Sequence, residues 1–282
     1  MKKYIRIFPV LIFLLSLCKS VSAQETTLNP DSVLYKKAWQ AGLRLKSDGF
    51  SLNAEIARSK RFKREFIIQV GFSFYLSPKQ VKQDSPLGGG GLFGSDGFKR
   101  FVYGKQNNQL NLYAGVGQRF LLAEKARKHG VQIFYKYAGG ITLAILKPYM
   151  LKIAQLDTSA PNTIVGFEDV QFDKNNLDNG FLYPFPYVTN DLKFIAGASG
   201  FGKGWKLKLV PGLHIETGID FDFGKNDRFI KALEVGVMCD FYYKKLPVMV
   251  DIDIDGQSIK NSNKFMYPSV FVGLSLGKRK MK

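Results

Sequence analysis

The stretch WKLKLVPGLHIETGIDFDF (205–223) decides how the rest of the chain is interpreted. Counted from Trp205, every second residue is apolar with the single exception of Thr217, and the residues between them are mostly charged or small. A period of two over so long a run predicts one extended strand with an oily face and a polar face. Either the oily face packs inside a soluble barrel or sandwich, or it faces lipid around a membrane barrel.

The N-terminus predicts export. MKK is followed by the apolar run YIRIFPVLIFLLSL and by small residues ending at Ala23, which is the pattern of a cleaved signal peptide over 1–23. Residues 24–38 are then expected to form a periplasmic segment. Cleavage removes Cys18 and leaves Cys239 alone, so the mature chain is not expected to contain an internal disulfide.

Composition narrows the class of protein further. No later segment approaches 20 uninterrupted apolar residues, which excludes a spanning helix. The formal net charge is +18 and the isoelectric point is about 9.7. In an exported chain this excess favours outer-membrane lipids, lipopolysaccharide or acidic protein partners over nucleic acid.

Eight alternating segments are expected to be strands. They cover 39–47, 50–58, 65–76, 109–121, 131–147, 205–223, 228–243 and 265–277. The connections after the second, fourth and sixth are short, whereas 77–108, 148–204 and 244–264 are long. This asymmetry is typical of outer-membrane barrels, with short periplasmic turns and long extracellular loops. We therefore expect an all-β fold, an eight-stranded antiparallel up-and-down transmembrane β-barrel over 39–278, with a basic periplasmic tail at 279–282.

Aromatic residues mark the two borders of the predicted apolar band. They are Phe66, Phe120, Phe221, Phe223 and Phe229 towards the short turns, and Phe50, Phe72, Phe74, Trp205, Phe241 and Tyr243 towards the long loops. Two such belts around an aliphatic band are expected at membrane interfaces. Tyr135 and Tyr137 fall within the aliphatic band and fit this pattern less well.

The opposite face predicts a filled lumen. It combines glycines with a polar network consisting of Arg44, Lys46, Glu55, Glu65, Arg119, Lys136, Lys206, Lys208, His214, Glu216, Asp220, Asp222, Glu234 and Asp240. An eight-stranded barrel is just wide enough for side chains to fill, and these charges nearly balance, so a salt-bridged interior is expected instead of a pore. Pro211 predicts a bulge, or a strand that begins after it.

The start SVSAQ, the alternating Gly/aromatic strands and the closing VFVGLSLGKRK resemble the small outer-membrane β-barrel proteins of Bacteroidetes, of the OmpA/OmpX-like or PorT-like kind. The latter belong to the type IX secretion system. The resemblance covers most of the mature chain and implies the eight-stranded membrane barrel. It transfers no activity, and the basic tail departs from the usual terminal aromatic residue.

Motifs with possible chemistry are weak. His214 and Glu216 share one face, as an oriented histidine in a lipid-modifying enzyme would require, but no serine is fixed as their partner. DIDIDG at 251–256 resembles the start of a calcium loop, yet the twelfth position is Ser262 instead of glutamate. GGGGLFG at 88–94 lacks the strand-to-helix context of a nucleotide loop. We assign no catalytic residue, metal or cofactor.

Charged segments suggest where partners bind. The basic stretches 58–64, 124–129 and 278–282 all fall on the predicted periplasmic side, where anionic headgroups or a protein could bind them. The long segment 148–204 carries acidic residues and the aromatic stretch at 181–188. The expected function is a non-enzymatic outer-membrane scaffold or accessory component, for example of a secretion system. The alternatives are a lipid-modifying barrel enzyme and a soluble secreted lipocalin-like binding barrel.

Overall fold

The computed structural model describes residues 35–61, 63–77, 80–83, 100–102, 104–124, 130–156, 164–171, 193–200, 202–224, 228–249, 252–254, 257–259 and 263–281. Eight long strands dominate these residues. They are β1 (Tyr35–Lys46), β2 (Gly49–Arg61), β3 (Arg64–Tyr75), β6 (Asn107–Ala123), β7 (Gln132–Pro148), β11 (Lys208–Asp222), β12 (Phe229–Tyr242) and β15 (Met266–Met281). Within the described residues, no helix is long and apolar enough to span a membrane.

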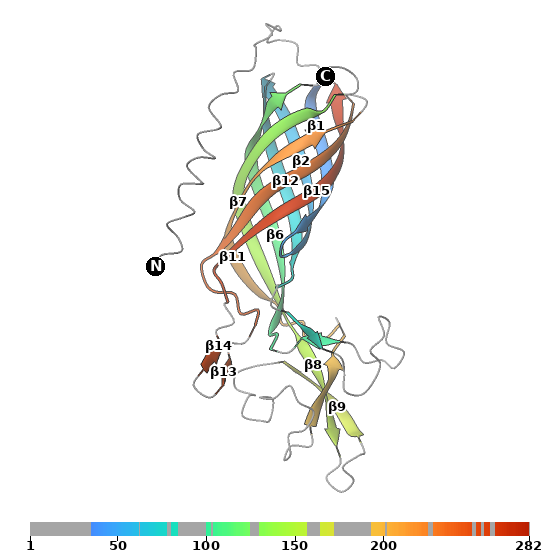
Figure 1. Cartoon of the computed structure of the whole chain (residues 1–282), viewed down its shortest axis with the longest axis vertical. Coiled ribbons are helices and arrows are strands. Elements are labelled where there is room, and N and C mark those ends of the chain that lie inside the picture. Colours follow the sequence, from blue (N-terminus) through green and yellow to red (C-terminus); the bar gives the residue numbers. More distant parts are fainter. Residues whose placement is uncertain are drawn as a thin grey trace. The chain divides into compact units, whose positions relative to one another are not determined.

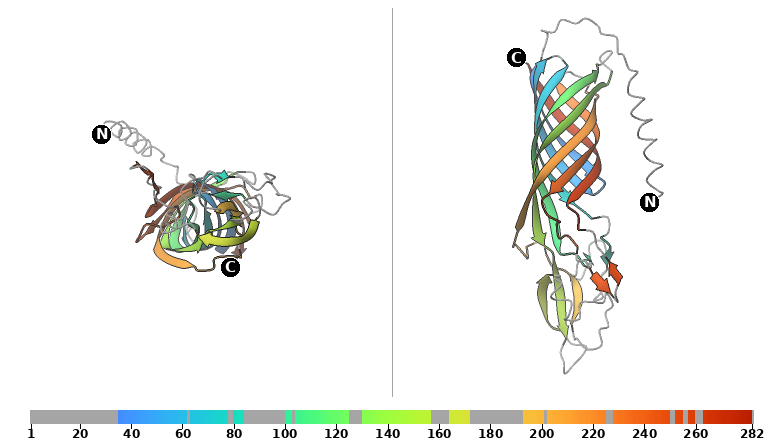
Figure 2. Two further views of the ribbon diagram at one scale, coloured as in Figure 1. Left: turned by 90° about the horizontal axis from the view of Figure 1, so that it is seen from below. Right: turned by 90° about the vertical axis from the view of Figure 1, so that its left-hand side faces the viewer.

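The eight long strands form a closed antiparallel barrel in the order β1-β15-β12-β11-β7-β6-β3-β2 (Figures 1 and 2). Each strand pairs with its neighbour in the chain, and β15 returns to β1 with Lys46 opposite Phe271 and Lys37 opposite Lys280. The predicted fold class and strand number are confirmed. Closure removes the open sheet edges that would otherwise leave backbone groups unpaired.

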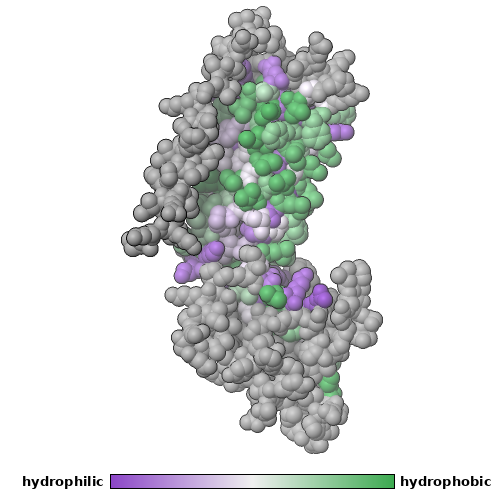
Figure 3. Space-filling model, viewed as in Figure 1, coloured by the Kyte–Doolittle hydropathy of each residue, from purple (hydrophilic) through white to green (hydrophobic). Residues whose placement is uncertain are grey.

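The barrel wall separates the two faces of each strand. On β11, Leu213 and Ile215 are 60% and 54% exposed, whereas His214 and Glu216 are buried. The same alternation runs along β1, β2, β6 and β15, and Figure 3 shows apolar side chains gathered over the outer wall. The oily face therefore points outward and the polar face inward. The alternative of a lipocalin-like barrel, in which the oily face of each strand points inward, is wrong for this chain.

The two ends of the barrel differ in their connections. At one end, here called the short-turn end, the gaps 62–63, 124–131 and 223–228 join β2 to β3, β6 to β7 and β11 to β12. At the other, the long-loop end, the gaps before β6, β11 and β15 are much longer. The tight β1–β2 hairpin also lies there, and Gly49 adopts a φ of 141° close to the Phe74 carbonyl, where a side chain would collide.

Several strand ends differ from the sequence prediction, and β11, for example, begins at Lys208 instead of Trp205. β1 begins at Tyr35, within the segment assigned to the periplasm, and β15 continues to Met281, so most of the predicted tail extends the last strand. Pro211 causes no bulge, and β11 does not start after it. Pro211 stays in register with Leu143 of β7, while pairing with β12 begins only at Gly212. Its missing N–H therefore falls where β11 is an edge strand.

Tyr135 and Tyr137 are not misplaced in the aliphatic band. Both point outward, and the register puts Tyr135 opposite Phe120, at the level of the aromatic residues of the short-turn end. The Thr217 hydroxyl donates a hydrogen bond of 3.0 Å to the Tyr135 hydroxyl. These tyrosines therefore extend the aromatic row at that end.

Among the residues that the structure describes, the long-loop end carries three small sheets. β7 leads into β8 (Met150–Leu156), which pairs with β9 (Ile164–Gln171) and β10 (Lys193–Ala198) in the order β10-β8-β9 (Figure 1). β4 (Lys82–Gln83) pairs with β5 (Phe101–Val102), and β13 (Ile252–Ile254) pairs with β14 (Gln257–Ile259). The long segment 148–204 is thus partly a sheet of its own.

Candidate functional site

The centre of the barrel is occupied by ion pairs that join opposite walls. Arg44 on β1 donates through Nε to Glu234 on β12 at 2.8 Å and through Nη1 to Glu216 on β11 at 2.9 Å. Its exposure is 0%, so both pairs are fully removed from solvent. Arginine suits this position because its planar donors serve two carboxylates at once.

A second arginine binds three further carboxylates. Arg119 on β6 lies 2.6 Å from Glu55 Oε1 on β2, 3.1 Å from Asp220 Oδ2 on β11 and 3.4 Å from Glu65 Oε2 on β3. Glu65 is the one partly exposed member of this set. Four strands are joined through one guanidinium, so the network restrains the wall as well as filling the lumen.

Lys136 on β7 connects these two groups. Its Nζ lies 3.1 Å from Glu234 Oε2 and 3.2 Å from Asp220 Oδ1, and 3.7 Å from Glu55 Oε2. Lys136 is also fully buried. It shares Glu234 with Arg44 and Asp220 with Arg119, so the three cations and their carboxylates form one continuous cluster. We call Arg44, Arg119, Lys136, Glu55, Glu216, Asp220 and Glu234 the central ionic network.

His214 extends this network towards the long-loop end. Its Nδ1 lies 2.6 Å from Asp240 Oδ1 and its Nε2 lies 3.4 Å from Glu216 Oε2. The ring stacks on Tyr113, with centroids 4.3 Å apart. Both ring nitrogens are thus occupied by carboxylates, and the side chain is 0% exposed. No hydroxyl nucleophile is among its hydrogen-bond partners within the described residues.

Inward aromatic rings fit over glycines on the wall. A Cβ on Gly71 would lie 2.2 Å from the Tyr113 ring, and one on Gly236 would lie 2.7 Å from the Phe271 ring. The Arg44 guanidinium lies 4.6 Å from the Phe271 centroid. Glycine at these positions therefore makes room for large rings inside a narrow barrel.

The interior changes character at the long-loop end. Here the apolar cluster, called the mouth plug, consists of Val102, Ala144, Leu146, Val210, Tyr242, Leu246, Val248, Met249 and Tyr267, all buried. Val102, Leu246, Val248 and Met249 come from the long loops, and the others come from strand ends. Asn263 fixes one loop by accepting from the amides of Val248 and Met249 and donating to the Met249 carbonyl.

The short-turn end is filled more simply. Small and aliphatic residues form a second apolar cluster of Ala38, Ala57, Ile67, Ala138, Ile230 and Ala232. Arg279 donates to Asp222 Oδ2 at 2.7 Å and to Gln132 Oε1 at 3.2 Å. Ionic, aromatic and apolar groups therefore fill the lumen from one end to the other.

Most residues of the predicted polar network lie inside the barrel. Lys46 pairs with Asp48 at 3.2 Å near the long-loop end, and Asp222 pairs with Arg279. The prediction is wrong for Lys206 and Lys208, which are exposed. Lys206 precedes β11, and Lys208 lies where β11 has β7 but not β12 beside it, so neither residue is enclosed by the wall.

The predicted interface aromatics all avoid the interior. Phe50, Trp205, Phe223, Phe229 and Tyr243 are exposed, and Phe66, Phe72, Phe74, Phe120, Phe221 and Phe241 are partly exposed. Phe50 stacks on Phe74 with centroids 5.6 Å apart, and the Lys147 ammonium lies 4.4 Å from the Trp205 ring.

Sequence reasoning missed several inward residues. Gln40, Asn53, Gln69, Gln109, Asn111 and Thr142 are buried, and each has the same strand parity as a predicted charged residue. Parity alone could have identified them. Tyr113 shares this parity with Arg119 on β6, whereas no predicted charged residue marks the inner face of β15, which carries Phe271. Arg279 was assigned to the tail, and nothing in the sequence linked it to Asp222.

Other candidate motifs remain without a site. No group of three or more potential metal ligands occurs among the residues that the structure describes. Ile252–Ile254 forms β13, whereas Asp251, Asp255 and Gly256 lie outside the described residues, as do the signal peptide, 88–94, His129 and 181–188.

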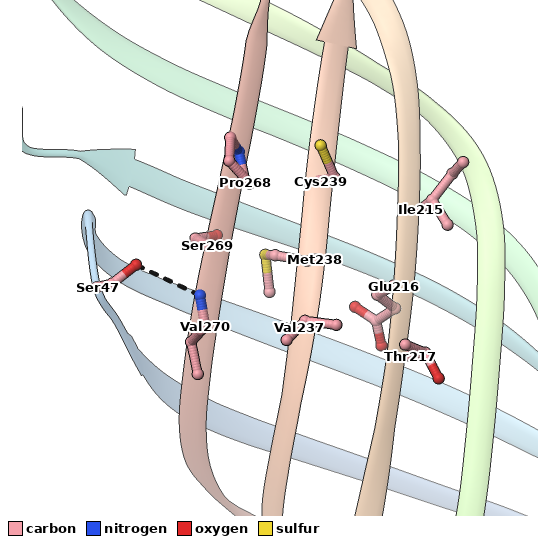
Figure 4. A pocket seen from close by; sticks show the side chains of 10 residues that line it. All are labelled: Ser47, Ile215, Glu216, Thr217, Val237, Met238, Cys239, Pro268, Ser269 and Val270. Atoms are coloured by element: carbon pink, nitrogen blue, oxygen red, sulfur yellow. Dashed lines mark hydrogen bonds between the residues drawn. The ribbon is translucent and has the colours of Figure 1, made fainter. Parts of the chain in front are cut away.

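A hollow of about 320 Å³ lies on the outer wall near the long-loop end. Outward residues that line it include Ile215, Thr217, Val237, Cys239, Pro268 and Val270 (Figure 4). It forms because β1 ends at Lys46 while β15 continues, and the Ser47 hydroxyl closes the step by accepting from the Val270 amide at 3.3 Å. This apolar hollow belongs to the outer face of the wall and carries no chemistry of its own.

No protein-family profile matches the sequence, and no curated protein matches it. Among solved structures, similar chains include Neisserial surface protein A, at 8% identity and a TM-score of 0.36 over 87% of this chain and 97% of that one. The N-terminal β-barrel domain of Pseudomonas aeruginosa OprF gives 7% identity and 0.32, over 87% and 98%. Ail, the attachment invasion locus protein of Yersinia pestis, gives 7% and 0.33, over 87% and 99%.

Proposed function

We propose that this chain is an outer-membrane β-barrel that acts as a non-enzymatic scaffold or accessory component, with a lumen that does not conduct. The observation that carries the proposal is the combination of an apolar outer wall with an interior filled by the central ionic network and the mouth plug. A closed barrel with this distribution is stable in lipid, since every strand is paired and the charges face one another.

The filled lumen argues against a transport role. Arg44 spans from β1 to β11 and β12, and Lys136 fills the space between the carboxylates. A diffusing solute would have to separate these buried pairs, which is costly. The barrel is therefore better suited to holding its loops in place than to passing a substrate.

Three measurements test this assignment. Membrane fractionation should recover the protein in the outer membrane, and the detergent-extracted protein should shift in gel mobility on boiling. In planar bilayers the purified barrel should give no stepwise conductance. Recovery without detergent would overturn the membrane assignment, and regular conductance steps would overturn the sealed lumen.

A lipid-modifying activity is not favoured by the geometry. His214 is the residue such an enzyme would use, yet it lies inside the barrel between Asp240 and Glu216 and is not accessible from the lipid face. Purified protein is expected to leave phospholipid and lipid A unchanged. Turnover that disappears in His214→Ala while the boiling shift is retained would restore the enzyme hypothesis.

The sheet β10-β8-β9 is the proposed partner-binding element. β9 is an edge strand that, within the described residues, pairs only with β8, and it exposes Val165 at 68% and Phe167 at 49%. An exposed edge of this kind can accept an extended segment of another protein as an added strand. The sequence resemblance to PorT-like barrels suggests a component of a secretion machine as that protein.

Site-specific photocrosslinking in intact cells tests the edge. A crosslinker at Val165 is expected to give a discrete adduct with a second protein. Val81, 70% exposed and just before β4, is the matched control at the same end of the barrel and should give none. Equal adducts at both positions, or none at Val165, would contradict a binding site at β9.

A further inference from the structure

The outer wall at the short-turn end contains a basic hollow that the scaffold role does not explain. It has a volume of about 460 Å³ and is lined by Trp39, Arg228, Lys278, Arg279 and Lys280. Four of these five residues are cationic, and none is acidic. It is formed by β1, the last residues of β15 and the connection that leads into β12.

Strand register arranges these residues in two rows. Lys278 lies opposite Trp39 of β1 on one side and Phe229 of β12 on the other, and all three point outward. One step further from the barrel centre, Lys280 lies opposite Lys37, which in turn lies opposite Arg58 of β2. An aromatic row is thus followed by a cationic row.

The apolar wall begins directly next to the aromatic row. Leu276 and Leu274 precede Lys278 on the same face of β15 and are 64% and 61% exposed. Moving along β15, the surface therefore changes from aliphatic to aromatic to cationic within a few residues. This is the sequence of environments that a phospholipid presents, from acyl chain through glycerol to phosphate.

Three of the four cations of the hollow are available for a ligand. Arg279 is bound inward to Asp222. In the part of the chain that the structure describes, Arg228, Lys278 and Lys280 form no salt bridge, and the Lys278 ammonium lies 6.0 Å from the Phe229 ring centroid. Positive charge without a protein counterion, at the border between the apolar wall and the cationic row, attracts the anionic headgroups of a membrane surface.

We propose that this hollow binds the headgroup of an anionic phospholipid, with its phosphate between Arg228, Lys278 and Lys280 and its acyl chains along Leu276 and Leu274. Trp39 and Phe229 flank the glycerol region. The inference rests on the proposed membrane location and adds a specific lipid class and site to it.

Trp39 itself provides the test, because the chain contains only two tryptophans. Trp205→Phe leaves Trp39 as the single reporter in a barrel reconstituted into phosphatidylcholine vesicles. Brominated phosphatidylglycerol, added as a minor component, is expected to quench Trp39 several-fold more effectively per lipid than brominated phosphatidylcholine. The double variant Lys278→Gln and Lys280→Gln should reduce this preference to near one.

A charge-matched control separates a site from general attraction. Lys63→Gln with Arg64→Gln removes two exposed cations at the same end but outside the hollow, and the preference should remain. Equal loss in both double variants would overturn the site in favour of diffuse surface charge. Equal quenching by the two brominated lipids in the parent would overturn it too. If neither lipid quenches Trp39, the membrane location itself fails. Retention of the boiling shift shows that each variant is folded.

Discussion

The centre and the mouth of the barrel are both buried, yet they exclude water by different means. The central ionic network consists of strand residues that are matched charge by charge across the lumen. The mouth plug consists of aliphatic and aromatic residues, and several of them come from loops. Buried charges tolerate no missing partner, whereas apolar packing loses stability in proportion to the volume removed. The two regions should therefore respond differently to substitution.

The largest expected effect is at the centre. Arg44→Met leaves Glu216 and Glu234 buried without their guanidinium, and the free energy of unfolding should fall by about 3–5 kcal/mol. Urea unfolding of the barrel in lipid vesicles measures this. Arg58→Met, an exposed arginine on β2, should change it by less than about 0.5 kcal/mol.

A compensated variant sharpens that result. Adding Glu216→Gln and Glu234→Gln to Arg44→Met removes the uncompensated charges, and we expect part of the lost stability to return. If Arg44→Met alone is as stable as the parent, the centre does not depend on charge matching.

Substitutions in the mouth plug should lower the free energy of unfolding by less than those at the centre. Leu246→Ala creates a cavity in the mouth plug and should cost about 2–3 kcal/mol, towards the lower end for a buried leucine because loops can collapse into the space. Leu207→Ala, at an exposed leucine of the same end, is the control and should cost little in the same unfolding experiment. A loss at Leu246 equal to that at Arg44 would erase the contrast between the regions.

The fit of the Tyr113 ring against Gly71, between the centre and the mouth, should contribute less to the free energy of unfolding. Gly71→Ala would place Cβ against the Tyr113 ring and should cost about 1–2 kcal/mol through overpacking. Gly139→Ala is the matched control, since the nearest atom to its Cβ is 3.8 Å away. Chemical shifts of the His214 imidazole should move in the first variant only, because Tyr113 stacks on that ring whereas Gly139 neighbours only the His214 backbone carbonyl. Equal unfolding energies would show that the ring is free to move.

The most local effect concerns Lys105, which lies in the loop before β6 and is buried beside the mouth. Burial, with the nearby Lys82 charge, lowers the pKa of Lys105 to about 8, and its ammonium donates to Gln80 Oε1 at 3.2 Å. The unfolded chain then binds more protons between pH 8 and about 10.5, so local stability should rise with pH across that window. Hydrogen exchange of the bridged Met249 region measures it, and Lys105→Met should flatten the profile.

The strand pattern was predictable because lipid and lumen impose opposite demands on alternate residues. Arg44, Glu55, Arg119 and Lys136 could be placed from parity alone. Lys206 and Lys208 have the right parity but lie beyond the enclosed wall, and parity cannot show where a neighbouring strand stops.

The mouth plug could not be foreseen for a related reason. Leu246 and Val248 lie in an irregular connection and Val102 in the two-residue strand β5, so no repeating pattern marks them, and their contacts depend on how distant segments meet. The sheet β10-β8-β9 was likewise hidden in a segment interpreted as one long loop. Which carboxylate each cation binds is equally a matter of three-dimensional position, so the lumen residues were predictable but their partners were not.

The pairing of the last strand with the first has a consequence for biogenesis. Arg44 lies on β1, but its carboxylate partners lie on β11 and β12, near the opposite end of the chain. Until β15 joins β1, a nascent barrel inserting into the bilayer would hold an unneutralised guanidinium beside hydrocarbon. The free energy of partly inserted states is thereby raised. Closure of the barrel and neutralisation of the Arg44 guanidinium should then occur together, as one cooperative event. The ionic network should therefore favour the completed ring over partly closed intermediates.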